Sequence, residues 1–201
     1  MSSISLLPSA KKLHRLPARR IVAYAVRCAR RVESLFCELS PDRSRAEFMR
    51  NAIEFATRYV NQEPLGIVNR DRRPFQQFAP DQSFSAACYA MYAADEAIAV
   101  EQDPDYDWEA AKDDESTIAH RAHDAASLAW TATHMAREIE MDVATASVAD
   151  YKALRKLPED APFDLRRFPV ADLWPAGEPP IVTARNAVLA AILSGDPPSA
   201  G

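Results

Sequence analysis

The fold is decided by STIAHRAHDAASLAWTATHMAREIEMDVATASVADYKALR, residues 116–155, a stretch that no proline or glycine interrupts. Its apolar residues recur every three or four positions, the spacing that places side chains on one face of an α-helix. Most of them are alanines, and small side chains let helix backbones approach closely. Because globular helices seldom run this far, we expect two helices with a break near residues 141–149. The face consists of Ile118, Ala122, Ala125, Ala129, Ala132, Ala136, Ile139 and Val143.

Four further segments repeat this helical spacing between residues that start or stop helices. Pro17 suits a first helical turn, Ser40-Pro41-Asp42 is a capped start, and Gly195 follows the last segment as a stop. The segments are residues 17–39, 40–62, 81–102 and 181–194.

The segment 17–39 has a polar stripe of arginines beside its apolar one, so a basic helix lying on a membrane surface is one interpretation. Its back is apolar as well, which favours a helix packed inside a bundle. The arginines are Arg20, Arg27 and Arg31, and the back carries Val22, Val26 and Ala29.

These patterns predict an all-α fold. The chain has 201 residues with only 4 glycines and 15 prolines, and the prolines cluster between the helical segments. We expect one helical domain over residues 1–201, a bundle of about five to six helices. Residues 158–180 are too rich in proline for a helix and too apolar for a linker, which predicts an irregular strap across the bundle. Residues 1–15 and 196–201 are expected to be loose.

The net charge of −5 argues against general nucleic-acid binding, because neutralising phosphates needs a cationic surface. No apolar run is long enough for a membrane span, and the N-terminus lacks a secretory pattern. We therefore expect a cytoplasmic protein that has no membrane partner. Three cysteines without a ligand spacing agree with reduced core thiols. No cofactor is expected, since the glycines stand apart and form no phosphate loop.

An acidic segment follows the third helical stretch. Residues 101–115 hold eight carboxylates with Tyr106 and Trp108 among them. The segment lacks the central glycine and the final glutamate of an EF-hand, which argues against calcium. Two interpretations stay open, a solvated loop and a contact for a basic partner. The candidate contact residues are Asp103, Asp105, Tyr106, Asp107 and Trp108.

Histidines gather in the alanine-rich stretch. His120, His123 and Asp124 lie within about 6 Å along a helix axis, whereas His134 is roughly 21 Å from His120. The first three are therefore the only members of the group that could bind one metal ion, with further ligands from another helix. The alternative is the polar edge of a half-buried helix.

The stretches ARRIVAYAVRCARRVESLF (18–36) and AHRAHDAASLAWTATHMA (119–136) resemble the all-α immunity proteins of bacterial polymorphic-toxin systems, over about Leu16 to Val148. The resemblance implies a protein that inhibits a cognate protein toxin by binding it, encoded beside that toxin, and it implies no catalytic residues. The competing hypothesis is a metal-dependent helical hydrolase centred on His120, His123 and Asp124.

Overall fold

The structure is a computed structural model that describes residues 6–38, 43–65, 82–107, 117–133, 139–158, 164–166 and 172–194. Across these ranges the chain is helical and has no β-strand, which confirms the predicted all-α class. The described part contains seven α-helices, of which the shortest, α1, was not expected. In chain order the elements are α1 (Ala10–Leu13), α2 (Ala18–Val32), the 3-10 helix η2 (Glu33–Glu38), α3 (Arg43–Val60), α5 (Gln82–Gln102), α6 (Ile118–Ala132), α7 (Glu140–Lys156) and α8 (Pro180–Ser194).

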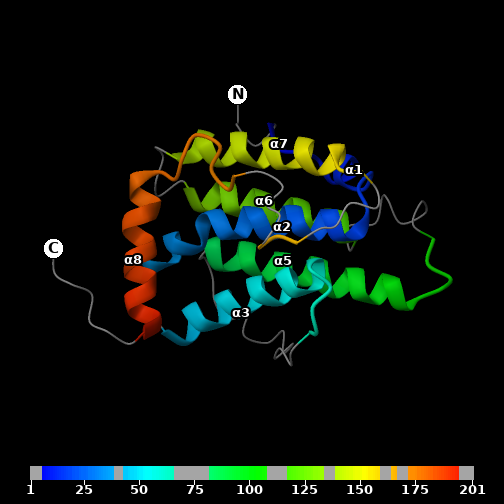
Figure 1. Cartoon of the computed structure of the whole chain (residues 1–201), viewed down its shortest axis with the longest axis horizontal. Coiled ribbons are helices and arrows are strands. Elements are labelled where there is room, and N and C mark those ends of the chain that lie inside the picture. Colours follow the sequence, from blue (N-terminus) through cyan, green and yellow to red (C-terminus); the bar gives the residue numbers. More distant parts are fainter. Residues whose placement is uncertain are drawn as a thin grey trace.

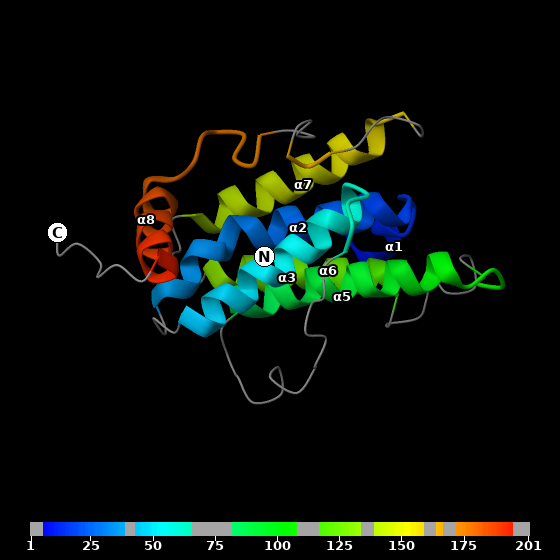
Figure 2. The ribbon, with the colours of Figure 1, turned by 60° about the horizontal axis from the view of Figure 1, so that its bottom comes forward.

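Helix α2 is the centre of the bundle. Every residue from Ile21 to Ala29 is buried, and α2 contacts α3, α5, α6 and α7. Figures 1 and 2 show α2 between these helices, with α8 crossing one end of the bundle. A helix that is buried on all sides belongs to a core, so the bundle interpretation of this segment is confirmed over the membrane-surface one.

The alanine-rich faces of α5 and α6 pack against each other, in the most extensive contact between any two elements of the described residues. Alanines at both faces are fully buried, including Ala90 and Ala94 of α5 and Ala122 and Ala125 of α6. The predicted close approach of helices through small side chains is therefore present.

The break between α6 and α7 lies earlier than the sequence predicted. Residues 141–149 are helical, and α6 instead ends at Ala132. The side chain of Thr133 donates a hydrogen bond to the carbonyl of Trp130 at 2.5 Å, so Thr133 bonds to the backbone of the last turn. Nothing between 141 and 149 disfavours a helix, and the two-helix prediction holds with its boundary moved.

The expectations for the two ends of the chain and for the strap have different outcomes. Within residues 1–15, which were expected to be loose, α1 is helical, and Leu7 and Leu13 are buried in the core. Burial of these apolar side chains stabilises the segment against the bundle. Residues 196–201 lie outside the described part. Of the expected strap, residues 164–166 and 172–179 are described as non-helical, and Trp174 is buried.

None of the described helices combines the length and the apolar character that crossing a bilayer requires.

Candidate functional site

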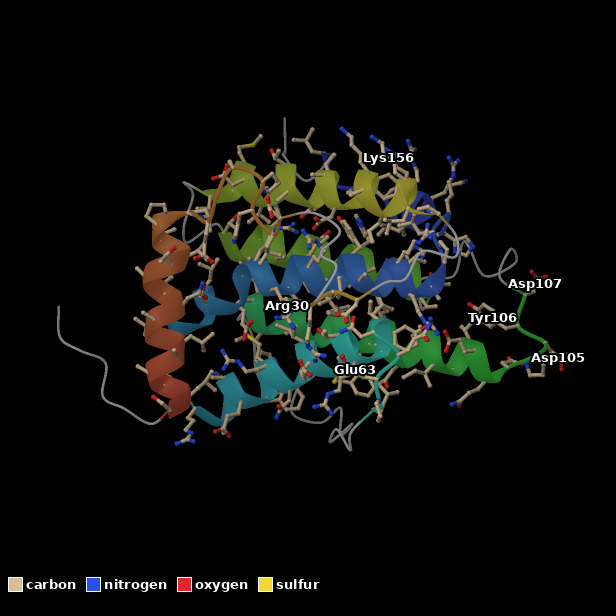
Figure 3. The ribbon with its side chains drawn as sticks, viewed as in Figure 1. Arg30, Glu63, Asp105, Tyr106, Asp107 and Lys156 are labelled. Carbon is tan, nitrogen blue, oxygen red and sulfur yellow. The ribbon has the colours of Figure 1, made fainter. Side chains whose placement is uncertain are left out.

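The C-terminal end of α5 projects beyond the other helices and leads into the turn 103–107, called the acidic turn below (Figure 1). Asp105, Tyr106 and Asp107, labelled in Figure 3, stand at its tip. Asp103, Asp105 and Asp107 are exposed and Tyr106 is half-buried. Trp108, predicted with them as a contact residue, lies outside the described residues.

Local hydrogen bonds fix the shape of the acidic turn. The carboxylate of Asp103 accepts a hydrogen bond from the backbone N–H of Asp105 at 3.0 Å, and the Asp103 carbonyl accepts one from the N–H of Tyr106 at 3.3 Å. This pattern is an Asx turn, in which an aspartate side chain bonds the backbone two residues further on. Asp103 therefore shapes the turn, while Asp105 and Asp107 present charge to solvent.

Glu101, at the end of α5, is hydrogen-bonded to the neighbouring helix α3. The hydroxyl of Tyr59, near the end of α3, donates a hydrogen bond to Glu101 Oε1 at 2.8 Å. Burial, reinforced by this bond to a carboxylate, raises the pKa of Tyr59 well above its ordinary value. The contact anchors the last turn of α5, two residues before the acidic turn begins.

The histidines of α6 take part in local structural contacts. Thr117 caps α6, accepting a hydrogen bond from the backbone N–H of His120 at 3.4 Å, and its hydroxyl lies 3.0 Å from His120 Nδ1. His123 Nδ1 lies 3.0 Å from the carbonyl oxygen of Pro8. A carbonyl can only accept, so Nδ1 of His123 carries a proton and only Nε2 could bind a metal.

Asp124 is half-buried beside these histidines, and His134 lies outside the described part. Within the described ranges no three or more His, Cys, Asp or Glu side chains come together in a way that could hold a metal ion. The sequence-predicted ligand set is thus adjacent along α6, but no described helix completes it as a metal site.

The core contains a buried polar cluster that was not predicted from the sequence. Asp150 of α7 forms ion pairs with two arginines of α2, at 2.8 Å to Arg27 Nε and 2.5 Å to Arg31 Nη2. The contact to Arg31 is an ion pair between Nη2 and the second carboxylate oxygen, Oδ2. The three side chains are 5%, 0% and 1% exposed for Arg27, Arg31 and Asp150.

The same arginines hold the chain that precedes α8. Arg27 donates to the carbonyl of Asp172 at 2.9 Å and Arg31 to the carbonyl of Leu173 at 2.8 Å. The guanidinium of Arg31 lies 6.0 Å from the ring centre of Trp174, within reach of a cation–π interaction. The cluster therefore joins α2, α7 and residues 172–174.

Burial governs the chemistry of this cluster. It raises the pKa of Asp150, and the two arginines oppose that rise. Burial also raises the pKa of the Cys28 thiol, which lies 3.5 Å from Ser147 Oγ. The Ser147 hydroxyl donates to the Val143 carbonyl at 2.8 Å, so the thiol is the donor to Ser147 and keeps its proton. A protonated, fully buried thiol is a core residue and no nucleophile.

A signal for Asp150 was present in the sequence. Val143, Ser147, Asp150 and Leu154 recur every three or four residues and are all buried, so Asp150 occupies a core position of α7. A carboxylate at such a position requires a cation. Arg27 and Arg31, one turn apart on α2, are the matching pair of cations.

A cavity of about 260 Å³ lies beside this cluster, where α2 meets residues 165–166 and 172–173. Residue 166 is held at α3, because Arg166 forms ion pairs with Glu54 and Glu63. The backbone N–H of Leu165 also donates to Asn61 Oδ1 at 2.8 Å. A second cavity, of about 450 Å³, lies between the start of α7 and residues 176–181.

The chain matches no family model, no curated protein and no solved structure.

Proposed function

We propose that this protein is a cytoplasmic immunity-type binding protein that neutralises a cognate bacterial toxin by direct protein–protein contact. The observation that carries the proposal is the acidic turn, an ordered and exposed group of aspartates at the end of a helix that projects from the bundle (Figure 3). The proposed contact comprises Asp103, Asp105, Tyr106 and Asp107, with Trp108 as a further anchor.

Electrostatics support a basic partner. Clustered carboxylates repel one another in the free protein, and a cationic surface relieves that repulsion on binding. The net charge of −5 adds a long-range attraction for such a partner. Complementary charge speeds encounter, and aromatic side chains contribute most of the affinity once they are desolvated.

The proposal leaves the core without a functional role in binding. The Arg27–Asp150–Arg31 cluster and the irregular strap expected over residues 158–180 would then hold the scaffold in shape. A rigid scaffold lowers the entropy that the contact loses on binding. No observation among the described residues favours the metal-dependent hydrolase, because no three or more possible ligand side chains come together among them.

The test is neutralisation by a defined pair. The protein encoded beside this chain's gene is expressed alone and together with this chain, and growth is compared. We expect growth arrest from that protein alone, rescue on co-expression, and a purified 1:1 complex. The test variant carries Asp105→Asn and Asp107→Asn, which remove two exposed carboxylates from the acidic turn. The control variant carries Glu47→Gln and Asp142→Asn, which remove two exposed carboxylates from α3 and α7. Equal rescue by both variants, or no toxicity and no complex, contradicts the proposal.

A further inference from the structure

The cavity beside α2 combines an apolar wall with a concentration of arginines. Val26, Leu165 and Leu173 form the apolar part. The polar lining consists of Arg27, Arg30, Arg166 and Asp172. Its volume of about 260 Å³ lies below the roughly 300–1,000 Å³ typical of sites for drug-sized ligands, so only a small molecule fits.

The arginines of the lining differ in how their charges are compensated. Arg166 is paired with Glu54 and Glu63, and Arg27 with Asp150. Arg30, labelled in Figure 3, donates to the hydroxyl of Thr57 at 3.1 Å and pairs with no carboxylate among the described residues. Arg30 is therefore the one arginine of the described lining whose charge no described carboxylate neutralises.

Thr57 fixes the position of that arginine. The Thr57 hydroxyl donates its proton to the Ile53 carbonyl at 2.8 Å, so it accepts from Nη2 of Arg30. One nitrogen of the guanidinium is thus used for positioning, and none of the described residues accepts a hydrogen bond from the others, which can bind a ligand. A planar guanidinium with two free donors matches the two oxygens of a carboxylate.

The cluster behind the cavity adds to the positive potential. Arg27 and Arg31 together carry two positive charges against the single carboxylate of Asp150, and all three are nearly inaccessible to solvent. Charges in such an environment are poorly screened by salt. Asp172, whose side chain is exposed, supplies the only negative charge in the described lining. When Glu54 and Glu63 are counted with Arg166, the charges at the site sum to zero, and the excess of positive charge lies on α2, in Arg27, Arg30 and Arg31.

We propose that this cavity binds a small organic monocarboxylate, with its carboxylate on Arg30 and its apolar body against Val26, Leu165 and Leu173. The proposal is independent of toxin binding, since the acidic turn is formed by other elements. Inorganic phosphate fits less well, because the lining offers one uncompensated arginine and an apolar wall that phosphate cannot use.

The test is a titration of the ¹⁵N-labelled protein with sodium butyrate and sodium hexanoate, followed by NMR at constant ionic strength. We expect saturable shifts at residues 26, 165 and 173, and none with butyramide or n-butanol. Binding of butyramide as strong as butyrate, or no saturable shift with either acid, overturns the proposal. Tighter binding of phosphate, or of an acetylated tripeptide with a free C-terminus, than of butyrate overturns the proposal. The preferred ligand would then be phosphate or a peptide C-terminus.

Two substitutions with opposite expected effects separate binding from structure. Arg30→Gln should weaken butyrate binding by about tenfold or more, since a hydrogen-bonded charge is lost. Asp172→Asn should strengthen it, because the negative charge at the cavity is removed while the backbone carbonyl that Arg27 binds is retained. Arg155→Gln, which removes an exposed arginine of α7, is the control and should leave affinity unchanged.

If Arg30→Gln fails to fold, Leu165→Trp tests the same cavity by filling it. This residue is half-buried at the cavity wall, and the larger side chain should abolish the shifts caused by butyrate. Retained binding in a folded Leu165→Trp protein, or equal affinities of the wild type and the Asp172→Asn and Arg30→Gln variants, overturns the assignment.

Discussion

The carboxylate of Asp150 lies 2.8 Å from Nε of Arg27 although 123 positions separate the two residues in the chain. The pair, completed by Arg31, connects the central helix α2 to α7 in a part of the core that solvent does not reach. An ion pair in that setting has a large desolvation cost, which its attraction offsets only while all members are present. Removing one member is therefore far more harmful than the net value of the pair suggests.

Asp150→Asn should lower the free energy of unfolding by about 3–5 kcal/mol, because it leaves two buried arginines without a counter-charge. Urea unfolding at neutral pH measures the change. Asp142→Asn is the control, since Asp142 is exposed on the same helix and surface substitutions usually cost less than about 0.5 kcal/mol. A loss below about 1 kcal/mol for Asp150→Asn would show that the cluster does not hold the fold.

Stability should fall at alkaline pH. Burial raises the pKa of Cys28 and of Tyr24 above their ordinary values of 9.0 and 10.0, respectively, so both stay protonated in the folded protein. In the unfolded chain they ionise near those ordinary values, and the unfolded state then binds fewer protons than the folded one. Stability is therefore retained below about pH 9 and decreases as the pH rises further.

Denaturant unfolding between about pH 7 and 11 measures this dependence. Cys28→Ala and Tyr24→Phe should each flatten the alkaline decline. Val143→Ala, which destabilises the core without removing a titratable group, should retain the full decline. An unchanged alkaline slope in both Cys28→Ala and Tyr24→Phe contradicts the assignment of the pH dependence to these buried groups.

The contact between His123 and Pro8 should fasten the N-terminal segment to α6. His123→Ala removes the donor to the Pro8 carbonyl, so amides of residues 10–14 should exchange with deuterium faster and global stability should fall by about 1 kcal/mol. His120→Ala serves as the comparison, because His120 bonds to Thr117 within α6. Equal exchange of residues 10–14 in the two variants would mean that His123 does not hold this segment.

Dialysed protein should contain no stoichiometric zinc, manganese or iron, since the described residues bring no third ligand to His120 and His123. Elemental analysis of the wild type and of His123→Ala measures this directly. Metal that survives dialysis in the wild type and disappears in the variant would contradict the prediction and support the hydrolase hypothesis.

Helix positions could be predicted because they depend on local sequence. The segment 81–102 was expected between Asp81 and Pro104, and α5 covers Gln82–Gln102. The segment 181–194 corresponds closely to α8, Pro180–Ser194. Apolar spacing together with proline and glycine is enough to locate such helices.

Features that depend on distant partners were not predictable in the same way. Arg27 and Arg31 were expected on a polar stripe, but they are buried, because Asp150 on α7 compensates their charge. Similarly, the cavity at Arg30 depends on residues 165–166 and 172–173, far along the chain. Periodicity describes one helix at a time, and it does not specify which helices meet.

For the proposed function, the most direct measurement is the association rate constant with the toxin as a function of salt concentration. Asp105→Asn with Asp107→Asn should slow association and flatten its salt dependence, with stability unchanged or slightly raised, because the two exposed charges steer the partner. The control, Glu47→Gln with Asp142→Asn, should behave like the wild type. Wild-type association rates and salt dependence in the Asp105/Asp107 variant would contradict the acidic turn as the toxin-binding surface.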